Sequence, residues 1–151
     1  MYKTLKNNWA LFIGFAILAT AHGFQGNLLG VRAVIEEFNY LAVGALFSGY
    51  FLGYFIGAFY CPKLINSVGH IRTFSAFASL ASLSALLAAV YVNPVMWTLS
   101  RIVTGISLVS CYIVAESWLN DRATNKNRGQ LLSAYMIILY IGLGIGMLLL
   151  N

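Results

Sequence analysis

The chain has 151 residues, of which 60% are hydrophobic and 9% are charged, and its mean hydropathy is +0.81. Soluble domains average about 45–50% apolar and about 25% charged residues, so this chain has too few charges to cover a water-facing surface. The net charge is +5, but most of the lysines and arginines lie in short gaps between apolar runs and not on one amphipathic face. This placement argues against a nucleic-acid partner. The composition predicts an all-α transmembrane helical bundle whose main partner is membrane lipid.

The first predicted span covers residues 9–31 and follows a short polar head that contains Lys3 and Lys6. It is long enough to cross about 30 Å of hydrocarbon. The same residues also fit a signal peptide, with a basic head, an apolar core and the small residues 19–21 as a cleavage site. The apolar run continues past that site and further spans follow, which favours a retained membrane helix.

The second predicted span covers residues 40–61 and carries Gly49, Gly53 and Gly57 at intervals of four. Small residues at this spacing lie on one face of a helix and let two backbones approach closely in lipid, where van der Waals packing drives association. We expect these glycines to pack helices together rather than to contact a ligand.

Two short gaps separate the next predicted spans. Pro62 lacks a backbone N–H and is expected to end the second helix, and Gly69 is expected to permit a tight turn. The third span covers residues 73–92. The uncharged Asn93-Pro94 pair predicts a turn, and the fourth span follows over residues 95–119.

The fourth span carries two charged residues, Arg101 and Glu116, in an apolar context. A charge inside a membrane helix costs about 2.5–3.5 kcal/mol on insertion scales, so such residues usually face a partner or a watery cavity. The fifteen helical steps from Arg101 to Glu116 span about 22 Å and return to within about 60° of the same direction. Gly105 and Tyr112 fall in this sector. Position alone allows Arg101 either to face a cavity or to extend to the outer membrane interface. Tyr112 fits an aromatic wall for an organic substrate, and the alternative for an aromatic in a membrane helix is packing or anchoring at the interface.

Orientation follows from the positive-inside rule. One side of the predicted membrane collects seven cations and the other only Arg32, so the amino terminus is expected in the cytoplasm and the protein in the inner or plasma membrane. The fifth span, 131–150, is still apolar at Asn151. We therefore expect residues 1–151 to be the N-terminal transmembrane half of a longer protein, truncated before a sixth helix.

The first span carries two polar side chains about one turn apart on one face, His22 and Gln25. Gln25 would offer hydrogen bonds to a substrate, and His22 could change charge near neutral pH and take part in proton coupling. The alternative is an interhelical hydrogen bond, worth about 0.6 kcal/mol on average in one measured membrane protein. Asn27 lies on the opposite face and is expected to contact a neighbouring helix.

Several motifs resemble a known family. The segment Gly69-His70-Ile71-Arg72 and the R-x-x-x-G pattern from Arg101 to Gly105 resemble the N-terminal half of the major facilitator superfamily (MFS), and residues 116–117 with 127–136 resemble its YcaD-like branch. The resemblance covers essentially the whole chain. It implies twelve helices in two halves, a substrate cavity between them, alternating access, and a place for Arg101 in that cavity, associated with proton coupling.

The cytoplasmic loop between the second and third helices departs from the family pattern G-x-L-x-D-R-x-G-R-R. Pro62, Asn66 and Ser67 stand where the family has glycine, aspartate and arginine, and the part that remains is Gly69, His70 and Arg72. Because the aspartate is missing, we expect Glu116 to supply the acidic partner for Arg72 or Arg128 in a cytoplasmic charge network.

No enzymatic machinery is visible in the sequence. It has no nucleotide-binding loop and no metal-ligand spacing, and Cys61 and Cys111 are expected to be small packing residues. We predict a secondary active transporter of small organic solutes by alternating access, driven by an ion gradient, namely that of protons. No cofactor is expected. The expected partners are a small-molecule substrate of unknown identity and the missing C-terminal half of the same transporter. The alternative is a small membrane scaffold or assembly subunit. A membrane enzyme ranks last, because the intramembrane polar groups are sparse.

Overall fold

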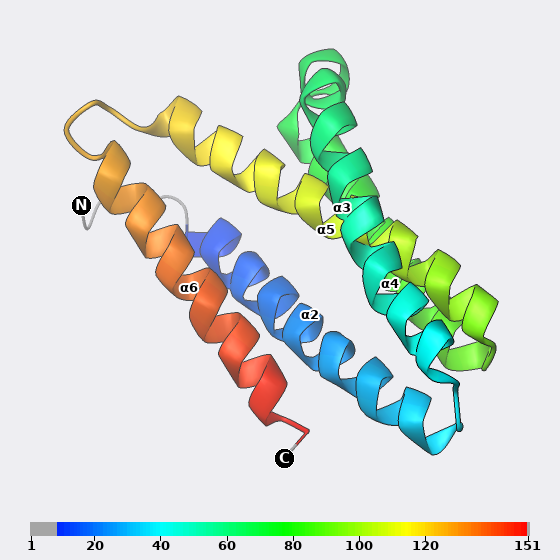
Figure 1. The fold of residues 1–151 in the computed structure, drawn as a ribbon. Helices are drawn as coiled ribbons and strands as arrows, with labels where there is room; N and C mark the ends of the chain where they lie inside the picture. Colours follow the sequence, from blue (N-terminus) through cyan, green and yellow to red (C-terminus); the bar gives the residue numbers. More distant parts are fainter. Residues whose placement is uncertain (1–8, 151) are drawn as a thin grey trace. The chain divides into compact units, whose positions relative to one another are not determined.

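The computed structural model describes residues 9–150, so the predicted polar head with Lys3 and Lys6 and the terminal Asn151 lie outside the described residues. Within that range the regular structure is helical, without strands. Each of the five helices is long and apolar enough to cross a membrane, which confirms the predicted all-α bundle. The helices, shown in Figure 1, are α2 (Trp9–Ile35), α3 (Tyr40–Val68), α4 (His70–Val90), α5 (Pro94–Arg122) and α6 (Arg128–Leu148).

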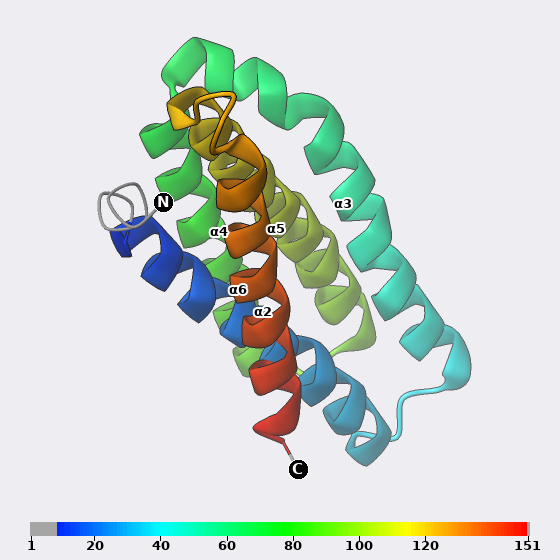
Figure 2. The ribbon, with the colours of Figure 1, turned by 90° about the vertical axis from the view of Figure 1, so that its left-hand side faces the viewer.

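The end of α3 corrects one prediction. Pro62 lies inside the helix, which continues to Val68 and stops at Gly69, where φ is +85° and the N–H donates to the Ile65 carbonyl. A proline removes one helical hydrogen bond, but abandoning the helix in lipid would expose many more backbone groups. Figure 2 shows α3 bending in its C-terminal third, as a proline predicts. The expected stop at Pro62 is therefore wrong, whereas the turn at Gly69 is confirmed.

The turn before α5 matches its predicted chemistry. Pro94 is the first residue of the helix, where its missing N–H costs nothing. The Asn93 side-chain oxygen accepts hydrogen bonds from the N–H groups of Val95 at 2.9 Å and Met96 at 3.3 Å. These bonds satisfy two amides that the helix itself leaves unpaired.

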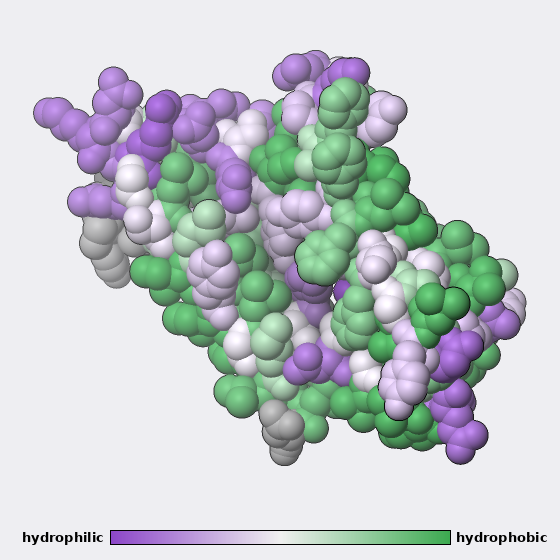
Figure 3. Space-filling model, viewed as in Figure 1, coloured by the Kyte–Doolittle hydropathy of each residue, from purple (hydrophilic) through white to green (hydrophobic). Residues whose placement is uncertain are grey.

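Close contacts divide the chain into two units, which we describe separately. One unit holds residues 37–118, with α3, α4 and most of α5. The other holds residues 9–36 and 119–150 of the described chain, with α2, the last turn of α5 and α6. Figure 3 shows apolar side chains along the helices and polar side chains gathered near helix ends, the pattern of lipid-facing helices.

In the smaller unit α2 and α6 lie side by side and run parallel (Figures 1 and 2). Glycines bring the two backbones together: a Cβ on Gly23 would collide with the Leu143 carbonyl, and one on Gly146 with the Thr20 carbonyl. This approach is the small-residue packing that replaces the hydrophobic effect in lipid.

Side-chain contacts extend the same interface along both helices. The rings of Phe15 and Tyr135 lie 4.8 Å apart between centroids, and the Asn27 side-chain amide donates to the Met147 carbonyl at 3.3 Å. Asn27 is therefore a helix contact, as its position on the face opposite His22 predicts.

In the larger unit three glycines of α3 that lie four residues apart, Gly49, Gly53 and Gly57, form a glycine ladder that packs against α5. A Cβ on Gly53 would overlap the Ile102 carbonyl, and one on Gly57 would lie 2.7 Å from the Ile106 carbonyl. Gly49 is less crowded, since its Cβ would lie 3.2 Å from the Thr98 carbonyl. At all three glycines the α5 backbone therefore lies closer to α3 than a larger residue would allow.

The third helix of this unit, α4, runs antiparallel to α5. The hydroxyls of Ser84 and Thr104 form a buried hydrogen bond of 2.8 Å between the two helices. Cys61 and Cys111 are both fully buried, and the Cys61 thiol donates to the Ser110 carbonyl at 3.5 Å, so the cysteines pack the interior as predicted.

The glycine contact can be tested by adding one methyl group. We expect Gly53→Ala to destabilise the chain by about 1–3 kcal/mol, because the new Cβ forces the α3 and α5 backbones apart. Thermal unfolding in detergent, followed by tryptophan fluorescence, measures the change. Gly44→Ala is the matched control on the same helix, since its Cβ meets nothing within 4 Å and alanine favours the helix. Equal effects of the two substitutions would contradict the packing assignment.

Candidate functional site

The site is built on α5, the most enclosed of the five helices. In its membrane-length window 56% of residues are buried, against 17–28% in the other four helices. Several of its buried residues are polar. The hydroxyls of Thr104, Ser107 and Ser110 each donate to a carbonyl one turn earlier, at 2.7–2.8 Å. These hydroxyls are satisfied within the helix and add no charge to the interior.

Arg101 is the exception among the buried polar residues of α5. Its side chain is 4% exposed, and its Cζ lies 4.5 Å from the centre of the Tyr50 ring of α3. The Nε and Nη1 atoms are buried and have no hydrogen-bond acceptor within the described structure. A cation thus stacks on one aromatic face while two of its nitrogens lack partners.

The free energies involved indicate that burying Arg101 in this way does not stabilise the fold. A desolvated cation–π contact contributes about 2 kcal/mol. The insertion cost of an intramembrane arginine is about 2.5–3.5 kcal/mol, and each buried donor without an acceptor adds about 1–3 kcal/mol. The observed contacts therefore leave Arg101 under-compensated, which is typical of a residue held ready for another partner.

The predicted charge pair between Glu116 and Arg72 is not formed. Glu116 is half-buried near the end of α5 and Arg72 is exposed in the first turn of α4, and no ion pair joins them in the described part of the chain. The helical repeat gives the reason. Arg72 lies two residues, or about 200°, around α4 from His70, which is the residue that meets α5.

A contact between His70 and Ser117 links these helix ends instead. The His70 Nε2 and the Ser117 hydroxyl lie 3.0 Å apart, within hydrogen-bonding distance, and the His70 and Trp118 ring centroids are 6.4 Å apart. Gly69 positions the histidine, because its positive φ ends α3 and starts α4 within a single residue. Arg128, the remaining member of the predicted network, is the exposed first residue of α6.

The other candidates occupy different settings. Gly105 packs against α3, because a Cβ there would collide with the Tyr50 carbonyl. Tyr112 is half-buried two turns further along α5. On α2, His22 and Gln25 are both half-buried, and the Gln25 Nε2 is buried without an acceptor from any described residue.

Tyr50 is the site residue that the sequence analysis missed. It meets both Arg101, through its ring, and Gly105, through its carbonyl. The available signal is its place directly after Gly49 in the glycine ladder, which puts it at the edge of the face that packs on α5.

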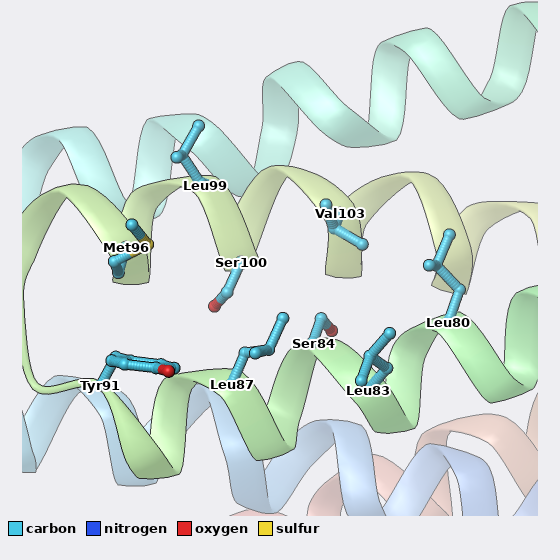
Figure 4. A pocket seen from close by; sticks show the side chains of 9 residues that line it. All are labelled: Leu80, Leu83, Ser84, Leu87, Tyr91, Met96, Leu99, Ser100 and Val103. Atoms are coloured by element: carbon cyan, nitrogen blue, oxygen red, sulfur yellow. The ribbon is translucent and has the colours of Figure 1, made fainter.

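A cavity of about 340 Å³ lies between α4 and α5, away from the predicted site residues (Figure 4). The two serine hydroxyls in its lining have partners: Ser84 lies 2.8 Å from both the Ala81 carbonyl and the Thr104 hydroxyl, and Ser100 donates to the Trp97 carbonyl. Its lining carries no charged group, so it suits an apolar occupant and not an ionic one. The lining residues are Leu80, Leu83, Ser84, Leu87, Tyr91, Met96, Leu99, Ser100 and Val103.

Comparison with known proteins identifies the family. The sequence profile of the Major Facilitator Superfamily matches residues 11–150, nearly the whole chain. The chain belongs to this superfamily. The five apolar helices and the family together make it a multi-pass membrane protein.

The curated relatives carry MFS transporter names. The chain is 28% identical over 141 residues to an uncharacterized MFS-type transporter of Enterobacter sp. (strain 638), and 29% identical over 143 residues to the MFS-type transporter YcaD of Shigella flexneri serotype 5b. Each alignment covers 93% of this chain and 37% of the relative, so the chain spans well under half of the length of these proteins. No solved structure matches the chain significantly.

The cost of burying Arg101 can be measured directly. We expect Arg101→Met to stabilise the chain by about 1 kcal/mol, because removing the charge saves more than the lost stacking on Tyr50. The unfolding midpoint in detergent should rise by about 2–4 °C. Lys126→Met, in the exposed loop before α6, is the control and should leave the midpoint unchanged. A lower midpoint for Arg101→Met would show that the arginine is a structural residue.

Proposed function

We propose that the protein is a secondary active transporter of small organic solutes, working by alternating access and coupled to a proton gradient. The observation that carries the proposal is the superfamily match over residues 11–150. The under-compensated Arg101 adds local support, since intramembrane charges mark substrate and ion pathways.

In this proposal the chain supplies the N-terminal half of the transporter. The curated relatives extend well beyond the aligned region, because the match covers 37% of their length. A second half would complete the substrate cavity between the two halves. The coding sequence after codon 151 tests this directly: the proposal requires an open reading frame through further apolar spans, and a stop codon there would favour a scaffold subunit.

The proposed solute contacts are Arg101 and Tyr112 on α5 of the larger unit and, taken separately, His22 and Gln25 on α2 of the smaller unit. Gln25 has a buried donor without an acceptor among the described residues, so a solute can satisfy it. His22 is the one of the four whose ordinary titration falls near neutral pH, which suits a proton carrier.

The proposed cytoplasmic gate is the junction of α3, α4 and the end of α5. The His70–Ser117 contact holds the start of α4 to α5, and Gly69 makes the sharp turn that this contact requires. Arg72, Glu116 and Arg128 lie at helix ends, where they can exchange partners as the gate moves. The proposed orientation, with the amino terminus in the cytoplasm, is supported by the excess of lysine and arginine on this side.

Transport is tested with the whole protein that carries this chain, reconstituted into liposomes containing a pH-sensitive dye. Anionic, neutral and cationic solutes are added in turn under an imposed pH gradient. We expect at least one solute class to move protons several-fold faster than in empty liposomes. Lys126→Gln should retain this flux. Rates equal to those of empty liposomes for every class would refute the proposal.

His22→Ala tests the proton-carrying role. If His22 carries the coupled proton, the variant should lose the dependence of the transport rate on pH between about 5.5 and 7.5, while solute binding persists. Rates measured across this range in the same liposomes decide the point. An unchanged pH profile would remove His22 from the coupling scheme.

A further inference from the structure

We infer that Arg101 and Tyr50 form an anion subsite, and that the transported solute carries a carboxylate which binds this arginine. The inference rests on the proposed transport function and names the class of its substrate. It follows from a side chain that is 4% exposed and has two nitrogens without acceptors in the described structure.

The chain itself offers no counter-charge to Arg101. It contains four carboxylates in all. Glu36 pairs with Arg32 at 3.3 Å, Glu37 is exposed in the following turn, and Glu116 lies about 22 Å further along α5. The fourth, Asp121, is exposed beyond Glu116 at the end of the same helix.

The neighbouring hydroxyls do not replace a counter-charge. Ser100 donates to the Trp97 carbonyl, and Thr104 donates to the Ser100 carbonyl while also bonding Ser84. A guanidinium stays protonated in proteins, so its positive charge persists whatever neutral groups surround it. An anion meets both needs at once, since it neutralises the charge and accepts from the free N–H groups.

The contact with Tyr50 leaves donors of Arg101 available to an anion. The Arg101 Cζ lies over the Tyr50 ring, 4.5 Å from its centre, and the buried Nε and Nη1 atoms have no acceptor in the described structure. A carboxylate can pair with a guanidinium through parallel N–H···O bonds. Tyr50 therefore covers the cation and supplies no acceptor to these two donors.

Access to the subsite requires movement. Because Arg101 is 4% exposed, a solute reaches it only when its cover opens, and alternating access supplies such an opening. Binding should then favour the open state and stabilise it.

Benzoate and its neutral isostere benzamide test the inference on the whole protein that carries this chain, purified in detergent, at constant ionic strength. With benzoate well above its dissociation constant, the unfolding midpoint should rise saturably by about 3 °C or more, and benzamide should raise it by less than about 1 °C. Equal shifts from the two compounds in the unmodified chain would overturn the inference.

Variants locate the site. Arg101→Gln should abolish the benzoate shift, Arg101→Lys should keep a shift with at least about five-fold weaker affinity, and Lys126→Gln should match the unmodified chain. If Arg101→Gln does not fold, the lysine variant carries the test alone. Undiminished benzoate affinity in the folded variant or variants would overturn the assignment to Arg101.

The outcome separates this inference from the proposed function. A benzoate shift without solute flux in liposomes would refute transport and leave the anion subsite standing. Flux of neutral or cationic solutes without a benzoate shift would refute the subsite and leave the transporter.

Discussion

The structure depends on a conflict between a positive charge and an apolar medium. Arg101 lies on the most enclosed helix, with stacking on Tyr50 as its main compensation. In a medium of low dielectric constant that contact does not repay the loss of water, and two donors within the described structure go unmet. Chains built for stability alone avoid this arrangement. In a transporter such a residue is useful, because only hydrogen-bond donors without a partner in the protein are free to bind a solute.

The rest of the larger unit holds this charge in place. The glycine ladder of α3 brings the α3 backbone against α5. Gly105 of α5, one turn after Arg101, lets the α5 backbone approach α3 at Tyr50. Close backbone contact fixes where the Tyr50 ring lies relative to the guanidinium. The serines and threonines of α5 close their hydrogen bonds within the helix or to α4, so they support the packing and offer Arg101 no counter-charge. The glycines are thus part of the site's construction, although they contact no ligand.

Local patterns predicted the fold well, because a membrane simplifies the problem. Backbone groups must be satisfied internally, so long apolar runs become helices, and small residues four apart become contacts between them. The same constraint explains the error at Pro62. A proline that would end a helix in water is carried through in lipid, where stopping leaves more groups unsatisfied, and Gly69 ends the helix because it adopts a positive φ.

The site was predicted only in part, because its contacts are between helices. Arg101 stood out as a charge in an apolar run, but Tyr50 lies fifty-one positions earlier and no periodicity connects the two. The sequence spacing also placed Glu116 near Arg72 and Arg128 as its expected partners. Among the described residues no ion pair joins Glu116 to Arg72, and the turn at Gly69 places His70, two residues before Arg72, beside Ser117.

The central claim is that the Arg101 position of α5, 4% exposed in this structure, opens during the transport cycle to a watery, solute-accessible space and not to lipid. Cysteine labelling in native membranes tests it most directly, with the two buried cysteines replaced by serine. Arg101→Cys should react with a membrane-impermeant, water-soluble thiol reagent, whereas Leu99→Cys, two residues earlier and 51% exposed on the apolar surface, should not. A reactive Leu99→Cys together with an unreactive Arg101→Cys would contradict the account.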